Sequence, residues 1–196
     1  YLVFEEINPA TWEPAERTVA VFQATRRGDG YDHFRRLDDP RRACRILLKE
    51  GEALLAFSYR LNEYADTFCR DATEAFLKRT HELYRESVGH EFGRAIPGIF
   101  TDEPCYGRAG HRVPWSAELV KFFRRSCGYD LLDHLPELFF AVGDFRKTRF
   151  DFYQNATRLF LLAWTLPVFQ WCDRNGLALT GHMMGEDTLR SQVECI

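Results

Sequence analysis

The most informative stretch of the chain is Ile96-Pro97-Gly98-Ile99-Phe100-Thr101-Asp102-Glu103-Pro104. An apolar run of strand length ends here in two adjacent acids followed by a proline. A buried strand needs no carboxylates, whereas ligands and catalytic groups of parallel α/β folds collect at the carboxyl ends of the strands. The stretch therefore predicts a buried parallel strand whose end presents Asp102 and Glu103 to a cleft.

Asp102 and Glu103 are expected to have different roles. Side chains alternate along a strand, so Asp102 and Glu103 should point to opposite faces if strand geometry continues through them. Glu103 lies nearer the strand end and is interpreted as the proton-transfer residue, with Asp102 in a supporting role. The simpler alternative is a solvated loop that is acidic by chance, and spacing alone does not separate the two.

A second set of polar residues begins at the end of another short apolar run, residues 177–182. There His182 is followed closely by Glu186 and Asp187, with glycines at 181 and 185 that let a ligand approach the backbone. If this run is a neighbouring parallel strand, both polar groups reach one rim, and Glu103 and Glu186 form a candidate catalytic pair. The alternative is an ordinary loop in which Asp187 caps the next helix.

The first part of the chain, residues 1–70, is predicted to be an antiparallel sheet, either an insertion or an accessory sheet. Strands are expected at 17–24, 44–48 and 53–59, with a hairpin turn over 49–52 between the last two.

The remainder, residues 71–196, alternates helical and strand patterns, which indicates parallel strands with helical crossovers. A helix over 71–88 is expected to begin at a capping box formed by Asp71 and Glu74. Ser116 is expected to cap a second helix, and a long helix over 144–175 should kink at Pro167. The fold class is thus α/β, a partial TIM-type barrel, since a complete one needs roughly 250 residues.

Other candidates for substrate binding are aromatic or polar side chains near these strand ends. Tyr106 and Trp115 follow the acidic pair and could stack on a sugar ring, and Arg60 and Asn62 close an earlier strand. His81 lies inside the 71–88 helix and could reach a site, but a histidine on the helix surface is the commoner explanation.

Composition excludes several partners. The chain has 196 residues and a net charge of −3, and its arginine pairs are interleaved with acids, so neither nucleic acid nor an anionic membrane is expected as a partner. No apolar run is long enough to span a bilayer. The six scattered cysteines form no Cys-x-x-Cys pair and favour free thiols in a soluble, cytoplasmic protein over a disulfide framework. The sequence begins at Tyr1 rather than methionine, so a signal peptide of a longer parent would not be visible.

At the level of motifs, the chain resembles the catalytic TIM barrel of bacterial glycoside hydrolases of the α-L-rhamnosidase-like family. The resemblance is carried by residues 98–104, 122–123, 128–131, 171–172, 176–177 and 180–182. It implies hydrolysis of glycosidic bonds in a carbohydrate substrate, with Glu103 as general acid. It also implies that calcium can help to hold the sugar, through oxygen ligands such as Asp102, Glu186 or Asp187, and that no other cofactor is required.

The sequence departs from this family in showing only two clear barrel strands, so a further catalytic acid on a later strand would lie beyond Ile196 and the isolated chain would lack it. Two other functions remain open. One is a metal-dependent hydrolase with Asp102, Glu103, His182 and Glu186 as ligands, and the other is a non-catalytic carbohydrate-binding protein.

Overall fold

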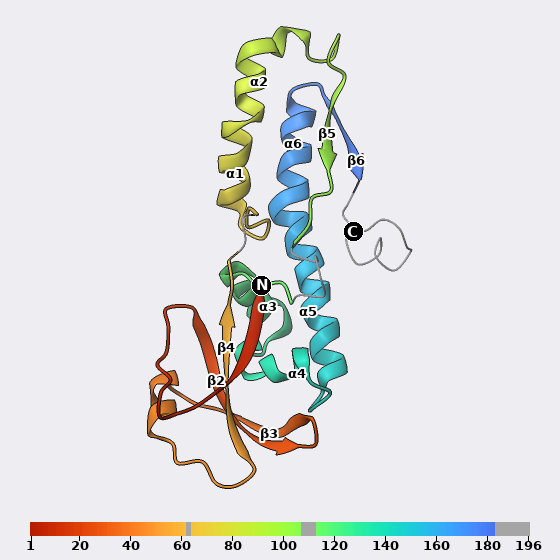
Figure 1. Cartoon of the computed structure of the whole chain (residues 1–196). Helices are drawn as coiled ribbons and strands as arrows, with labels where there is room; N and C mark the ends of the chain where they lie inside the picture. The colour runs from red at the N-terminus through yellow and green to blue at the C-terminus, as the bar shows by residue number, and fades with distance from the viewer. Residues whose placement is uncertain (62–63, 107–112, 183–196) are drawn as a thin grey trace. The chain divides into compact units, whose positions relative to one another are not determined.

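The computed structural model describes residues 1–61, 64–106 and 113–182. Contacts divide the chain into two compact units that interleave in sequence, and the division predicted after residue 70 stays a prediction. Unit 1 comprises Tyr1–Asn62, Gly107–Trp115 and Phe123–Phe152, and unit 2 comprises Glu63–Tyr106, Ser116–Phe122 and Tyr153–Ile196. Figure 1 draws the chain and labels its helices and strands where there is room.

Unit 1 is built on a four-stranded antiparallel sheet, as expected for the first part of the chain. Its strands are β1 (Leu2–Ile7), β2 (Thr18–Arg27), β3 (Gly30–Arg36) and β4 (Glu52–Tyr59), in the order β1-β4-β2-β3. The inner strand β4 pairs with both β1 and β2, which places the apolar run predicted over 53–59 in the centre of the sheet.

Both faces of β4 are buried, which explains its continuous apolar sequence. Leu54 and Ala56 belong to a core cluster with Val21 on one face. On the other face the ring of Phe57 lies 5.3 Å from that of Phe22 and 5.7 Å from that of Phe139, the last residue of helix α4 (Leu135–Phe139).

The predicted strand over 44–48 is wrong. Pro40–Arg45 forms a 3₁₀ helix, and the Asp39 side chain caps it by accepting a hydrogen bond from the Arg41 backbone N–H at 2.9 Å. Beyond it Leu47 is 94% exposed, so the apolar residues there do not form a buried strand.

Unit 2 contains helices and a pair of parallel strands. The helices are α1 (Arg70–Arg79), α2 (His81–Val88) and α6 (Leu166–Arg174), and the strands are β5 (Gly98–Asp102) and β6 (Ala178–His182). The register runs without a shift from Gly98 opposite Ala178 to Asp102 opposite His182. The sequence prediction of neighbouring parallel strands at these two positions is confirmed, although the described strands close no barrel and the barrel itself stays a prediction.

The helix predicted over 71–88 is two helices, and the capping box is wrong. The N-cap residue of α1 is Cys69, and Glu74 pairs with Arg70 at 2.9 Å rather than reaching back to the helix start. The break falls at Thr80, whose ψ is −72° and whose hydroxyl donates to the Phe76 carbonyl at 2.8 Å.

Helices α3 (Ala117–Cys127) and α5 (Phe145–Phe160) each contribute residues to both units. The expected Ser116 cap is confirmed, because its Oγ accepts a hydrogen bond from the Glu118 N–H at 3.2 Å. The long helix expected over 144–175 is interrupted before its proline, by the π-helical segment Leu161–Thr165. Proline cannot donate to the preceding turn, and a widened turn is one way a helix accommodates that loss.

Two glycines allow β5 and β6 to approach each other closely. A Cβ atom at Gly98 would lie 2.6 Å from the Ala178 carbonyl oxygen. At Gly181, where φ is +139°, a Cβ atom would lie 1.9 Å from the Thr101 carbonyl oxygen. Neither position tolerates a side chain without separating the strands.

We therefore expect Gly181→Ala to open the β5–β6 ladder. The matched control is Gly176→Ala, where φ is +67° but a Cβ atom would meet nothing within 4 Å, so that only backbone strain of about 1–2 kcal/mol is introduced. Amide hydrogen exchange of the ladder residues measures local opening directly. Faster exchange in Gly181→Ala than in Gly176→Ala is expected, and equal exchange in the two variants would contradict the close approach.

Candidate functional site

The carboxyl ends of β5 and β6 bring two sequence-predicted residues together. Asp102 lies opposite His182 in the register, and Oδ1 of Asp102 is 3.4 Å from Nε2 of His182. Just beyond, the Glu103 backbone N–H donates to the His182 carbonyl at 3.0 Å. We call Asp102, Glu103 and His182 the strand-end group.

Glu103 leaves the strand in an unusual conformation. Its φ is +48°, a left-handed value uncommon outside glycine, and Pro104 follows directly. Such positions cost of order 1–3 kcal/mol and tend to occur at functional sites. Strand geometry therefore ends at Asp102, and the expectation that the two acids point to opposite faces by strand alternation does not apply to Glu103.

The face of the sheet that carries Asp102 and His182 is open. Phe100 shares this face by strand alternation, is 62% exposed, and packs edge-on against the His182 ring with centroids 5.6 Å apart. The Asp102 side chain is 77% exposed, and Glu103 is also exposed. The strand-end group is therefore accessible to a ligand as it stands.

The remaining sequence-predicted residues are placed differently. Glu186, Asp187 and Asn62 lie outside the described residues. Arg60 and Trp115 belong to unit 1, and their part in substrate binding stays a prediction.

The structure places Tyr106 in the core of unit 2, which does not support its predicted stacking on a sugar. It is 6% exposed and packs against the rings of Phe68 and Phe160, with centroids 5.3 and 5.5 Å away. Its hydroxyl lies 3.1 Å from the Thr157 hydroxyl. The ring face that was expected to meet a ligand is thus covered by other aromatic side chains.

A cavity of about 320 Å³ adjoins the strand-end group. We call it the aromatic pocket. Its lining residues come from the segment before α1, from α1 and α2, from β5 and Pro104, and from the π segment and α6: Tyr64, Ala65, Phe76, His81, Ile99, Phe100, Thr101, Asp102, Pro104, Trp164 and Val168. Asp102 therefore belongs to both the pocket and the strand-end group.

His81, which the sequence analysis gives only as a residue that could reach a site, lines the aromatic pocket. The expectation of a surface histidine is wrong, because His81 is only 7% exposed. It begins α2 directly after the helix break, and its ring packs edge-on against that of Trp171 at 4.9 Å. The spacing of Thr73, Leu77 and His81 by four residues, all of them buried, was the signal that could have found it.

The hydrogen bonds of His81 define its tautomer. The Thr80 hydroxyl has one proton and donates it to the Phe76 carbonyl, so it accepts from Nδ1 of His81, 2.8 Å away. Nδ1 therefore carries the proton, and Nε2 is a lone-pair acceptor. Among the described residues Nε2 has no hydrogen-bond partner. Burial lowers the pKa of His81, and the Glu82 carboxylate opposes this only in part.

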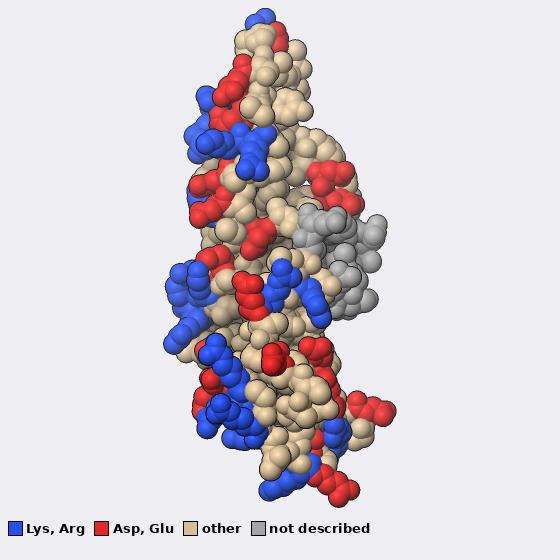
Figure 2. All heavy atoms as spheres, turned by 60° about the vertical axis from the view of Figure 1, so that its left-hand side comes forward, with Lys and Arg blue, Asp and Glu red and all other residues tan. Residues whose placement is uncertain are grey.

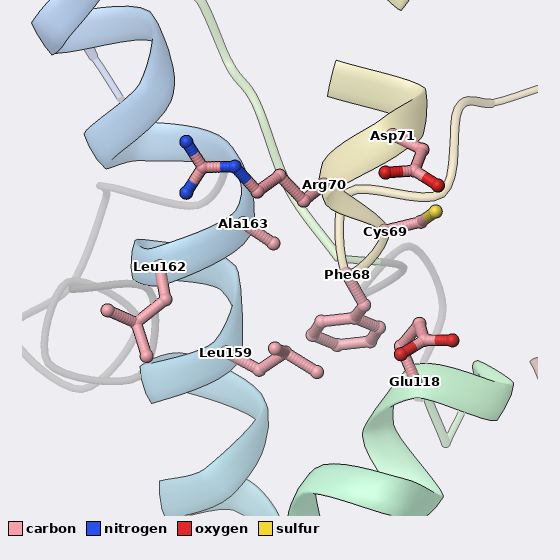
Figure 3. A pocket seen from close by; sticks show the side chains of 8 residues that line it. All are labelled: Phe68, Cys69, Arg70, Asp71, Glu118, Leu159, Leu162 and Ala163. Atoms are coloured by element: carbon pink, nitrogen blue, oxygen red, sulfur yellow. The ribbon is translucent and has the colours of Figure 1, made fainter. Parts of the chain in front are cut away.

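A second cavity, of about 330 Å³, is a weaker candidate (Figure 3). Figure 3 shows its apolar side chains, among them Phe68 and Leu159, and the charged groups of Arg70 and Glu118. These charges already have partners, because Arg70 pairs with Glu74 at 2.9 Å and Lys121 with Glu118 at 2.7 Å. No member of the strand-end group lines this cavity.

Charge on the surface is mixed in sign. On the face drawn in Figure 2, Lys and Arg side chains lie among Asp and Glu side chains. No described helix combines the length and apolar character needed to cross a membrane. The described part of the chain contains no cluster of three or more His, Cys, Asp or Glu side chains suited to a metal ion. The predicted calcium ligand Asp187 lies outside that part, so calcium binding stays a prediction.

Comparison with known proteins gives one distant structural relationship. No protein-family model and no curated protein matches the chain. A solved rhamnosidase structure from Novosphingobium sp. PP1Y is similar, with a TM-score of 0.50 and 18% sequence identity over 70% of this chain. The chain spans about 15% of the length of that rhamnosidase. The similarity concerns the fold alone. The similar protein is a rhamnosidase, the kind of enzyme that the sequence resembles.

We expect the buried, neutral state of His81 to make stability depend on pH. Because its pKa is lower in the folded chain than the value of about 6.5 in the unfolded chain, the unfolded chain binds the proton first as pH falls. The stabilisation is complete above about pH 6.5 and is lost as pH falls towards the folded pKa.

The measurement is urea denaturation of the wild type and of His81→Gln, which does not titrate, from about pH 7.5 to about pH 5. The wild type should lose stability relative to His81→Gln over this range. A constant difference between the two proteins would show that His81 titrates in the folded chain as it does in the unfolded one.

Proposed function

We propose that this chain is part of the catalytic domain of a glycoside hydrolase, and that α-L-rhamnosides are the first substrates to test. The observation that carries the proposal is the strand-end group. Two parallel strands in register end side by side in an acid pair and a histidine. The similarity in fold to part of a rhamnosidase supports the choice of reaction.

The proposed chemistry needs two carboxyl groups on opposite sides of a glycosidic bond. Glu103, exposed just past the end of β5, would protonate the departing oxygen, and a second carboxylate would attack the sugar or activate water. Glu186 is the candidate for the second role within this sequence. A separation of about 5 Å would give retention of configuration, and roughly 6.5–9.5 Å would give inversion.

Asp102 and His182 would support Glu103 rather than transfer the proton. Nε2 of His182 lies 3.4 Å from Oδ1 of Asp102, and the His182 carbonyl accepts the Glu103 backbone N–H, so both side chains lie beside Glu103. The exposed Asp102 carboxylate is also the type of oxygen donor that calcium prefers, and a bound calcium ion would help to orient sugar hydroxyls.

The direct test is Glu103→Gln in the full-length protein. Loss of a general acid is expected to lower kcat about 10²- to 10⁴-fold on a substrate whose leaving group needs protonation, such as an alkyl rhamnoside. A dinitrophenyl rhamnoside has a good leaving group, so its hydrolysis should suffer much less. Steady-state kinetics on the two substrates measure this contrast.

The matched control is Glu86→Gln, which removes an exposed carboxylate of α2 that lines neither cavity. Glu86→Gln should leave both substrates unaffected. Equal losses on both substrates in Glu103→Gln, or no loss on either, would contradict the general-acid role. Loss of activity on removing a stoichiometric transition metal would instead favour the metal-dependent hydrolase.

A further inference from the structure

We propose that unit 1 binds a sugar that carries an oxyanion, either a carboxylate or a phosphate, in a cavity on its antiparallel sheet. The cavity has a volume of about 420 Å³, and we call it the sheet cavity. Its polar lining residues come from β2, β3, β4 and the segment that precedes β4: Gln23, Thr25, His33, Arg35, Lys49 and Glu52. All of them belong to unit 1, so this site is independent of the strand-end group and of the reaction proposed there.

The sheet cavity lies where the apolar core of unit 1 ends. Gln23 of β2 lies opposite Arg35 of β3 and opposite Leu54 of β4, which belongs to the core cluster. Residues directly opposite each other share a face of the sheet, so Arg35 lies on the face that buries Leu54. Two residues further along β2, Thr25 lies opposite Glu52. Polar side chains thus replace apolar ones along the same face.

The cavity has an excess of positive charge that a ligand can reach. Arg35 and Lys49 are both exposed, and neither forms an ion pair with a carboxylate in the described part of the chain. The nearby Asp32 is already paired, because its Oδ2 lies 3.0 Å from Nη1 of Arg27. The two cations and the one carboxylate of the lining, Glu52, leave a net charge of +1 around the cavity.

Hydrogen bonds position both cations at the cavity. Nη2 of Arg35 donates to Oε1 of Gln23 at 2.5 Å, which directs the guanidinium across the strand pair and leaves its other N–H groups for a ligand. The planar guanidinium fits the two oxygens of a carboxylate or a phosphate. The Lys49 backbone N–H donates to Oε2 of Glu52 at 2.9 Å, which ties the segment that carries Lys49 to β4.

A β-bulge places His33 at the same cavity. The pairing of β2 with β3 shifts between Gln23 and Thr25, and His33 has a left-handed φ of +53° in this part of β3. Bulges redirect side chains, and a left-handed residue other than glycine costs of order 1–3 kcal/mol. The exposed imidazole lines the cavity and offers a ring N–H to a ligand.

The size and the remaining lining groups define the class of ligand. A volume of about 420 Å³ lies in the range of small-molecule sites and exceeds what a single oxyanion fills. Gln23, Thr25 and Glu52 carry the donors and acceptors that bind hydroxyl groups. A ligand that combines several hydroxyls with one oxyanion matches both sets of residues, and sugar acids and sugar phosphates have this combination.

The experiment is NMR titration of the 196-residue chain with D-glucuronate, glucose 6-phosphate and neutral D-glucose at constant ionic strength. At least one of the two charged sugars is expected to give saturable shifts of the Arg35 and Lys49 amides, with a Kd at least about tenfold below that of D-glucose. The charged sugar that binds more tightly identifies the oxyanion as carboxylate or phosphate.

Loss of either cation should weaken binding of the charged sugar. Arg35→Gln and Lys49→Gln are each expected to raise its Kd about tenfold, because each removes a charge-assisted hydrogen bond. The matched control is Arg41→Gln, which removes the same charge from an exposed residue of the Pro40–Arg45 helix that lines none of the three cavities. Arg41→Gln should leave the Kd nearly unchanged.

Loss of the one acid should strengthen binding. Glu52→Gln keeps a side-chain oxygen to accept from Lys49 but removes the negative charge, so the Kd is expected to fall about twofold to fivefold. The control is Glu50→Gln, which removes an exposed carboxylate outside the three cavities and should have little effect. A gain in affinity cannot come from a loss of fold, so this variant decides the case if Arg35→Gln fails to fold.

Three results would overturn the proposal. They are the absence of saturable shifts with both charged sugars, equal affinity for D-glucose, and a Kd that is indifferent to Arg35→Gln, Lys49→Gln and Glu52→Gln. None of these readouts involves hydrolysis, so the sheet cavity is tested separately from the general-acid role of Glu103.

Discussion

The site depends on one interaction, the parallel pairing of β5 with β6. This pairing places Asp102 opposite His182 and anchors the left-handed Glu103 through its hydrogen bond to the His182 carbonyl. It exists only because Gly98 and Gly181 bring no Cβ atom between the strands. A one-residue slip would turn each side chain of one strand to the opposite face and separate the acid from the histidine. The chemistry proposed for the strand ends therefore depends on the register in which β5 pairs with β6.

The same two strands explain why a larger domain is proposed. Parallel sheets are normally covered on both faces, and two strands are too few for independent stability. Yet Phe100 is 62% exposed on the face that carries the site. Phe100, Asp102 and His182 lie together on this open face. The inner face of a partial barrel without its other strands would show the same arrangement. The distant similarity in fold to 15% of a rhamnosidase supports this proposal.

The correct predictions relied on residues that mark, within the local sequence, where a strand ends or a helix begins. An apolar run that ends in Asp102 and Glu103 marked β5, the run ending at His182 marked β6, and Ser116 marked the start of α3. The failures had tertiary causes. Ile46 and Leu48 pack from a loop against a sheet that already has its strands, whereas Leu47 is exposed. His81 became buried because the helix breaks at Thr80. The stacking of Tyr106 on a sugar stays a prediction, which its enclosure by the rings of Phe68 and Phe160 does not support.

The most direct test of the central claim is the scalar coupling across the hydrogen bond between the Glu103 amide nitrogen and the His182 carbonyl carbon, measured by NMR on the deuterated chain. We expect a resolved coupling between these two atoms, together with couplings along the β5–β6 ladder in the same register. A Glu103 amide coupled to another carbonyl, or a ladder shifted by one residue, would contradict it.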